Sequence, residues 1–350
     1  DYGIQKGDRV AICMRNFPEW VMAFQAITSI GAIAVAMNSL WQADEIDYGL
    51  RDSGSVLLIA DQERIDLILQ AGIKLSCATL LPRGDQGTVL PRWEPLLEKF
   101  AGSAMPAADI APLDDVIIMY TSGSTGRPKG VVSSNLAIIS ALLSWELAIM
   151  GWILMRGEVP QPPAHQPAGL LAVPLFHVTG SHAMFLMAFR SQTKLVLMRK
   201  WDPQLAAQLI EREKVSSFTA PSAMTADLIH SAQQGGHDLS SLAMVGGGGA
   251  ARSPEQVRGI DTVFENAMPN TGWGMTETNA IGTAIAGEHY LERPGSSGQP
   301  AAVLDIRIAD DEGNVMATDE RGEVQIRGAS MFRGYWNKPE ATANSHIDGW

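Results

Sequence analysis

Apolar runs of strand length alternate with helical patterns along most of the chain, and this alternation restricts the fold more than any other feature. The run SVLLIAD (55–61) precedes QERIDLILQAG (62–72), and TKLVLM (193–198) precedes DPQLAAQLIEREK (202–214) and VSSFTAPS (215–222). Strands that alternate with helices form βαβ units, in which parallel strands share a sheet and helices cover both faces. The sequence therefore predicts an α/β fold with doubly wound, mostly parallel sheet.

One segment near the start approaches the length of a membrane-spanning helix. No charged residue occurs between Trp20 and Ala43, and about 20 apolar residues cross a bilayer. Gln25 interrupts the segment, however, and Gly31 divides it into a half with helical periodicity and a half rich in alanine and β-branched residues. We therefore predict a helix followed by a buried strand, and no integral membrane segment here.

The pattern changes at about residue 303. The runs LDIRIADDEGN (304–314) and GEVQIRG (322–328) are short, alternate in polarity and contain turn residues, which is typical of antiparallel sheet or a small barrel. We accordingly divide the chain into an α/β core, 1–302, and a β-rich subdomain, 303–350.

Composition excludes several classes of protein. The chain has 26 Lys and Arg against 38 Asp and Glu, a formal net charge of −12, which argues against nucleic-acid binding through a broad basic surface. Cys13 and Cys77 are the two cysteines and belong to no CxxC or Cys/His cluster, so we expect no disulfide scaffold and no zinc site. A reducing, cytoplasmic location is the default expectation.

The segment YTSGSTGRPKGV (120–131) carries the sharpest chemical signal. It follows a predicted strand and combines hydroxyls, glycines and two cations, which together suit a polyphosphate ligand. Gly130 follows Lys129, so the segment is not the ordinary P-loop, which has Ser or Thr there; the alternative is a flexible Ser/Gly loop. The candidate phosphate-binding residues are Thr121, Ser122, Gly123, Ser124, Thr125, Gly126 and Lys129.

Three further blocks carry candidate chemistry. NTGWGMTET (270–278) places the carboxylate of Glu277 between two threonine hydroxyls, oxygen donors of the kind that Mg²⁺ prefers; a solvated loop acid is the alternative. The four glycines of VGGGGAARSP (245–254) predict close backbone approach to a ligand, or a mobile loop. His177, in PLFHVTG (174–180), follows an apolar strand, where a lone histidine is more often structural.

Taken together, these blocks resemble the adenylate-forming (AMP-binding) superfamily, and most of all the acyl-CoA synthetases or fatty-acid–CoA ligases. The resemblance covers nearly the whole chain, in the family's order. Besides the phosphate loop, it rests on KGDRVAI, NFPEWVMAFQAITSIGAIAVAMN, PLFHVTG, GGGGAARSPE, NTGWGMTET and GEVQIRGASMFRGYWNKPEAT.

The resemblance implies a fold and a set of roles. The fold would have two doubly wound sheets and a distorted barrel. Lys129, Thr276, Glu277 and His177 would be catalytic: Glu277 supports magnesium, Thr276 contacts the α-phosphate, and His177 lies at the carboxylate end of the acyl pocket. Trp273 replaces a more common tyrosine beside the adenine, and Ala251 replaces a frequent proline. The remaining nucleotide-binding residues would be Gly248, Gly249, Ala250, Ala251, Asn270, Gly272, Trp273, Gly274 and Met275.

The implied reaction converts a carboxylic acid and ATP into an acyl-adenylate and then an acyl-CoA, with Mg²⁺ and coenzyme A. FHVTG lacks the acidic residue of the peptide-synthetase branch, which favours a plain, fatty acid over an amino acid. Met184, Phe185, Met187 and Phe189 would line an acyl pocket, or simply fill the core. An aryl-CoA ligase, another adenylate-forming enzyme and a non-catalytic acyl- or nucleotide-binding relative stay open. A homodimer is compatible with the sequence.

The resemblance also implies what lies outside the sequence. Family members continue into an acidic residue that grips the ribose, a hinge, and a C-terminal domain with the adenylation lysine. We expect the chain to be the N-terminal domain of such an enzyme, truncated before the hinge and poorly active alone.

Overall fold

The computed structural model describes residues 2–121, 126–157, 159 and 163–350. Their contacts group them into two compact units, each of which is described by itself. The first unit comprises the described residues of 1–136, 174–177 and 332–343, and the second comprises those of 137–173, 178–331 and 344–350.

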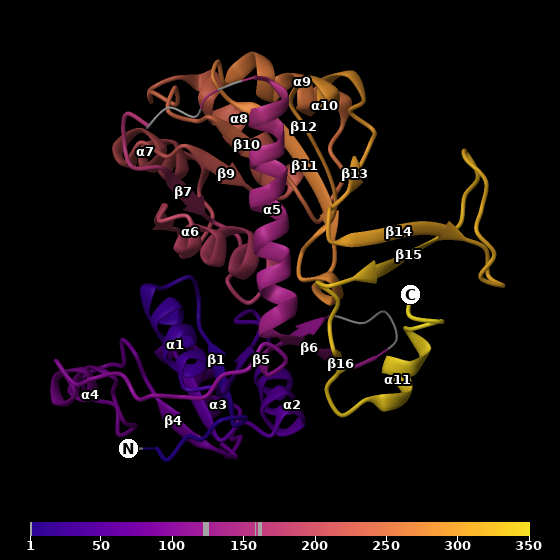
Figure 1. Cartoon of the computed structure of the whole chain (residues 1–350). Helices are drawn as coiled ribbons and strands as arrows, with labels where there is room; N and C mark the ends of the chain where they lie inside the picture. Colours follow the sequence, from indigo (N-terminus) through magenta and orange to yellow (C-terminus); the bar gives the residue numbers. More distant parts are fainter. Residues whose placement is uncertain (1, 122–125, 158, 160–162) are drawn as a thin grey trace. The chain divides into compact units, whose positions relative to one another are not determined.

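The first unit is built on a seven-stranded sheet with the order β16-β6-β5-β2-β1-β3-β4 (Figure 1). The strands from β5 to β4 in this order are parallel. Strand β6 pairs antiparallel with β5, and β16 pairs antiparallel with β6. Because the chain crosses from β1 to β2 in one direction and returns to β3 in the other, right-handed connections place α1 on one face and α2 and α3 on the opposite face. The elements are β1 (Arg9–Cys13), α1 (Pro18–Ser29), β2 (Ile33–Ala36), α2 (Ala43–Ser53), β3 (Leu57–Ala60), α3 (Gln62–Gln70), β4 (Ala78–Leu80), α4 (Glu94–Lys99), β5 (Asp115–Thr121), β6 (Lys129–Ser134), β16 (Gly334–Tyr335) and α11 (Pro339–Asn344).

The charge-free segment near the start folds as predicted. It forms α1 and then β2, whose four residues are all buried. Gly31 lies between them with a positive φ of 74°, a conformation that glycine adopts without strain.

Strand β6 was not predicted. The sequence analysis assigned no strand after the phosphate loop, but Lys129–Ser134 forms a strand antiparallel to β5. Its centre contains Val131 and Val132, which are buried, as is usual for β-branched residues in a sheet. The phosphate loop is therefore the loop of a β-hairpin, in which Thr121 is paired with Lys129.

The second unit contains another seven-stranded sheet, with the order β13-β12-β11-β10-β9-β7-β8. Strands β7 to β11 are parallel, β12 pairs antiparallel with β11, and β13 pairs antiparallel with β12. The prediction of mostly parallel sheets is confirmed. The elements are α5 (Asn135–Met155), β7 (Ala168–Leu171), a π-helix (Thr179–Leu186), α6 (Met187–Arg190), β8 (Lys194–Leu197), α7 (Pro203–Glu213), β9 (Ser217–Thr219), α8 (Ser222–Gln234), β10 (Met244–Gly246), α9 (Pro254–Val263), β11 (Met268–Gly274), a 3₁₀ helix (Thr276–Thr278), β12 (Gly282–Ala286), α10 (Gly287–Glu292), β13 (Gln299–Pro300), β14 (Leu304–Ala309) and β15 (Glu323–Gly328).

The alternating runs near the end form β14 and β15, which pair antiparallel as a two-stranded sheet. The contact grouping places both strands in the second unit and β16 in the first. The boundary between residues 302 and 303 stays a prediction.

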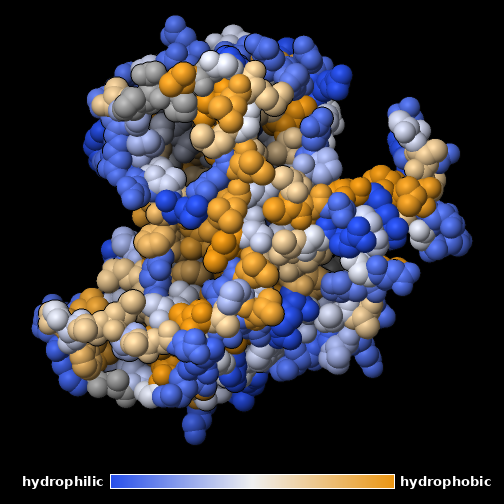
Figure 2. All heavy atoms as spheres, in the orientation of Figure 1, coloured by the Kyte–Doolittle hydropathy of each residue, from blue (hydrophilic) through white to orange (hydrophobic). Residues whose placement is uncertain are grey.

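Helix α5 is the one described helix that is long and apolar enough to cross a membrane by length and composition. Only 28% of its most apolar window is buried. Apolar side chains such as Leu143, Leu147 and Leu154 are exposed along it, and Figure 2 shows apolar atoms running along the helix.

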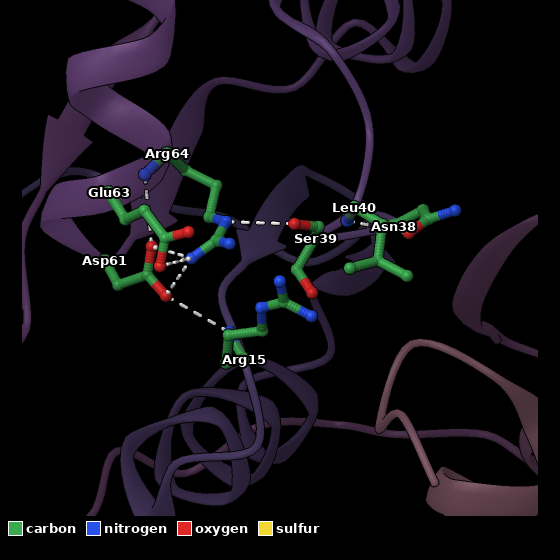
Figure 3. A network of polar contacts seen from close by, with 7 residues as sticks. All are labelled: Arg15, Asn38, Ser39, Leu40, Asp61, Glu63 and Arg64. Atoms are coloured by element: carbon green, nitrogen blue, oxygen red, sulfur yellow. Dashed lines mark hydrogen bonds and ion pairs between the residues drawn. The ribbon is translucent and has the colours of Figure 1, made fainter. Parts of the chain in front are cut away.

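A buried ion pair closes the carboxyl end of β3 in the first unit (Figure 3). Asp61 caps α3 by accepting a hydrogen bond from the backbone N–H of Arg64, and both carboxylate oxygens lie 3.0 Å from Nη1 of the same arginine. The carboxylate also accepts from the N–H of Arg15, at 3.1 Å, and Nε of Arg64 donates to the carbonyl of Ser39, at 2.9 Å. The pair thus joins three loops at one edge of the sheet.

Both cysteines are free thiols. Burial, assisted by the nearby carboxylate of Asp61, raises the pKa of Cys13 to about 12. Burial alone raises the pKa of Cys77 to about 11. Both side chains are therefore protonated at neutral pH, which makes them poor nucleophiles and poor metal ligands.

We predict that Asp61→Asn lowers the free energy of unfolding by about 3 kcal/mol, because it leaves the buried guanidinium of Arg64 without its charge partner. Asparagine keeps the shape and the helix-capping oxygen, so the change isolates the charge. Urea unfolding followed by circular dichroism measures the loss.

Glu63→Gln is the matched control. Glu63 pairs with the same arginine but has a side chain 54% exposed, and an exposed pair contributes at most about 1 kcal/mol. Equal losses in the two variants would contradict the assignment.

Candidate functional site

Four consecutive residues with unpaired backbone follow β10 in the second unit. Within the part of the chain that the structure describes, Gly248, Gly249, Ala250 and Ala251 form no hydrogen bond. Residues 249–251 are exposed. We call these four residues the open strip. Its amide and carbonyl groups have no partner among the described residues and are available to a ligand, because only buried backbone groups must be paired within the protein.

The backbone that leads into the open strip lies next to β11. The carbonyl of Gly247 accepts a hydrogen bond from the N–H of Gly272, at 3.0 Å. A Cβ atom at Gly246 would lie 2.7 Å from the side-chain oxygen of Asn270, so only glycine fits there. A Cβ atom at Gly248 would lie 3.6 Å from the carbonyl oxygen of Gly272, so the first residue of the strip borders β11 at Gly272.

Trp273 lies on β11 opposite Thr283 of β12. It packs against the hydrophobic cluster of Ala141, Ile281, Leu304 and Ile326, and its indole leaves no room for a Cβ atom at Gly282, which would lie 2.7 Å away. This packing gives Trp273 a role in the core of the second unit. Its contact with adenine stays a prediction.

The 3₁₀ helix Thr276–Thr278 follows β11 and is held in place by hydrogen bonds at its ends. The hydroxyl of Thr278 accepts a hydrogen bond from the N–H of Met275, at 2.9 Å. Asn279, in the left-handed conformation with φ of 54°, donates to the carbonyl of Ser330 and contacts Nε2 of His182, at 3.1 Å. The sequence analysis assigned no role to His182 and missed this supporting one.

The oxygen donors near Glu277 fit a phosphate-bound magnesium ion. Thr276 and Glu277 are partly exposed, whereas Thr278 is buried and uses its hydroxyl within the turn. No cluster of three or more metal-binding side chains occurs among the described residues. A single carboxylate suits Mg²⁺, which commonly takes one or two protein ligands and completes its shell with phosphate and water.

In the first unit, the two ends of the phosphate loop are tied to α2 through one carboxylate. The hydroxyl of Tyr120 donates to Asp52, at 2.8 Å, and burial together with this bond raises the pKa of the phenol. The hydroxyl of Tyr48 lies 3.3 Å from Asp52 and 3.1 Å from the carbonyl of Pro128. Both ends of the hairpin loop are thus held in place. Ser122, Gly123, Ser124 and Thr125 lie outside the described residues.

The two cations of the loop lie over aromatic rings. The ammonium group of Lys129 is 4.2 Å from the ring centroid of Tyr335, and the guanidinium of Arg127 is 4.9 Å from that of Tyr48. Such cation–π contacts orient a charge without neutralising it. Neither contact pairs these cations with a carboxylate.

His177 belongs to the first unit and ends a turn, which its N–H closes by donating to the carbonyl of Pro174, at 3.1 Å. The side chain is exposed, yet partial loss of hydration lowers the pKa of the imidazole. Of the expected acyl-pocket residues, which lie in the second unit, Met184 and Phe185 are buried while Phe189 is 68% exposed.

The chain matches the family of AMP-binding enzymes over residues 1–336. It belongs to this family. Among curated AMP-binding relatives, it is 28% identical to 4-coumarate–CoA ligase 1 of Arabidopsis thaliana and 30% identical to the long-chain-fatty-acid–CoA ligase FadD13 of Mycobacterium tuberculosis. Each alignment covers 99% of the chain, which spans 63% and 65% of these relatives' lengths.

The fold of this AMP-binding chain is also similar to solved structures. An inhibitor-bound N-terminal domain of FACL13 from Mycobacterium tuberculosis superposes with a TM-score of 0.84 at 27% identity. The alignment covers 99% of the chain and 82% of that domain. The recognised family and the two-sheet architecture are therefore confirmed together.

We predict that His177 is neutral at pH 7. Its pKa in the folded chain should fall below the ordinary value of about 6.5, because desolvation disfavours the imidazolium. Protonation of His177 then favours the unfolded chain, so the free energy of unfolding should fall as the pH drops below this ordinary value. At pH 8 the imidazole is neutral in both states and should not change the free energy of unfolding. An NMR titration of the imidazole protons, assigned with His177→Gln, measures this pKa. A folded-state pKa above that of the urea-unfolded chain would contradict the prediction.

Proposed function

We propose that the chain is the nucleotide- and acid-binding part of an ATP-dependent carboxylate–CoA ligase that activates a fatty acid. The observation that carries this proposal is the open strip, whose backbone lies against β11 in the second unit. Family membership supplies the ligand class, because the matched family consists of AMP-binding enzymes. The amides and carbonyls of such a strip can form hydrogen bonds with a nucleobase, because glycine lets a ligand approach the backbone closely.

The proposed reaction has two displacements. A carboxylate oxygen of the acid attacks the α-phosphorus of ATP, and pyrophosphate leaves with the electrons of the broken P–O bond. The thiolate sulfur of coenzyme A then attacks the acyl carbon, and AMP leaves. The first step needs mainly positioning and charge stabilisation, for which the proposal assigns Lys129, Thr276 and the phosphate loop.

Magnesium, when bound, would neutralise charge on the phosphates. Glu277 is the residue proposed to hold it, with Thr276 beside it on the same 3₁₀ helix. His177, neutral at pH 7, is proposed to orient the acid through an uncharged hydrogen bond. A cytoplasmic location belongs to the same proposal and is supported by two free cysteines.

An aryl acid is the second candidate substrate. The relatives include 4-coumarate–CoA ligases and a feruloyl-CoA synthase of Amycolatopsis as well as FadD13, and their identities to the chain differ by no more than two percentage points. A fatty acid is favoured by the apolar residues Met184 and Phe185 that follow the His177 block.

We predict that Lys129→Ala and Glu277→Ala each weaken MgATP binding about tenfold or more, because each removes a charged contact worth about 1.5–3 kcal/mol. Isothermal titration calorimetry of the folded chain measures the affinity. Lys74→Ala and Glu265→Ala, at exposed positions away from both blocks, are the matched controls. Unchanged affinity in both site variants would remove these roles.

Acid-dependent exchange of radiolabelled pyrophosphate into ATP tests the reaction itself. We expect slow exchange that rises above the acid-free background with fatty acids and falls in Lys129→Ala. A stronger response to coumarate than to any fatty acid would replace the fatty substrate by an aryl acid. Binding of MgATP with no exchange for any acid would favour a non-catalytic relative.

A further inference from the structure

One buried cation in the second unit has no acidic partner. Arg252 directly follows the open strip and is only 6% exposed. Burial lowers the pKa of its guanidinium, and the phenol of Tyr290 opposes this shift. Among the described residues, no Asp or Glu forms an ion pair with Arg252. Arginine nevertheless stays charged in proteins, so an uncompensated charge lies beside the strip.

Neutral oxygen atoms hold this guanidinium. Nη1 donates to the carbonyl of Asn270, at 2.9 Å, and Nη2 donates to the carbonyl of Gly246 and to the hydroxyl of Thr225, the latter at 2.9 Å. The carbonyl of Ala220 lies 3.5 Å from Nη2. Gly246 ends β10, Ala220 follows β9, and Asn270 belongs to β11. One planar group therefore joins three neighbouring strands, beside the residues where the strip begins.

The guanidinium also packs directly on the backbone before the strip. A Cβ atom at Gly247 would lie 2.6 Å from Cζ of Arg252, well inside contact distance. Gly247 in turn is bonded to Gly272 through its carbonyl. The open strip is thus anchored at one end by Gly247 and at the other by Arg252, and the two anchors touch each other. Between them, four residues form no hydrogen bond of their own in the described part of the chain.

A buried charge without a counter-ion is expensive, and an apolar side chain of similar volume usually stabilises a core at least as well. The cost is offset here by hydrogen bonds that only a flat, multidentate donor can form. We propose that Arg252 is a positioning residue of the nucleotide site, which fixes the open strip against β11 in the conformation that binds the adenosine part of AMP. This inference rests on the proposed function.

The experiment compares Arg252→Lys and Arg252→Met with the unsubstituted chain. Lysine keeps the charge but not the planar fork, and methionine keeps the length but not the charge. We expect AMP to bind at least tenfold more weakly to both variants in calorimetry, because both lose the fork. Pyrophosphate, which the proposal assigns to the loop of 120–131, should bind within twofold of the unsubstituted chain. A variant whose whole fold is destabilised is not expected to lose AMP binding while it keeps pyrophosphate binding.

Arg258→Met is the matched control, since Arg258 lies on α9 with a 61% exposed side chain paired to Glu255, and its AMP affinity should not change. If neither Arg252 variant folds, Gly247→Ala provides the test from the other anchor. Its added methyl group displaces the guanidinium and should weaken AMP binding at least tenfold. Gly259→Ala, whose new methyl would meet its nearest neighbour at an ordinary 3.6 Å, is its control.

The outcomes separate the two claims. Failure of the unsubstituted chain to bind AMP overturns the proposed function and the inference with it. If the unsubstituted chain binds AMP, and the folded Arg252 variants or Gly247→Ala bind it with an affinity within twofold of that chain, the inference alone is overturned. Equal losses for AMP and pyrophosphate would also overturn it, since they would show a merely structural role.

Discussion

Backbone pairing ends where a parallel strand leaves its sheet, and the groups beyond that point must find other partners. At β9, β10 and β11 the carbonyls of Ala220, Gly246 and Asn270 find them in Arg252. The four residues of the open strip, which begin after Gly247, find none among the described residues. Because ligands of open α/β sheets bind beyond the carboxyl ends of the strands, this unpaired stretch is where a nucleotide can replace missing protein partners.

Two buried arginines illustrate different uses of charge. Arg64 faces the carboxylate of Asp61, and the pair neutralises itself while it joins loops of the first unit. Arg252 has only neutral oxygens around its donors, and its charge stays uncompensated within the described part of the second unit. The first arrangement serves the fold. The second is costly for the fold, and we assign it to the positioning of the open strip.

The sequence allowed the βαβ units to be predicted because strand and helix periodicities alternate without interruption. It did not predict β6, since Lys129–Ser134 is short and leads directly into α5, so its hairpin pairing with β5 has no local signal. His182 was missed for a similar reason: its partner Asn279 lies 97 residues away. Within the site, glycine runs predicted close backbone approach, whereas nothing in the order of the residues indicated that Arg252 would fold inward against Gly247. Residues 122–125 of the phosphate loop lie outside the described residues, so their role stays a prediction from the sequence.

An NMR titration of the ¹⁵N-labelled chain with AMP tests most directly whether the open strip is the nucleotide surface. The amide signals of Gly248, Gly249, Ala250 and Ala251 should shift with one common dissociation constant, together with that of Gly272 across the border with β11. Glycines on the second unit's surface away from the strip, such as Gly235 and Gly313, should not shift. Saturable AMP binding that leaves the four strip amides unchanged would contradict the assignment.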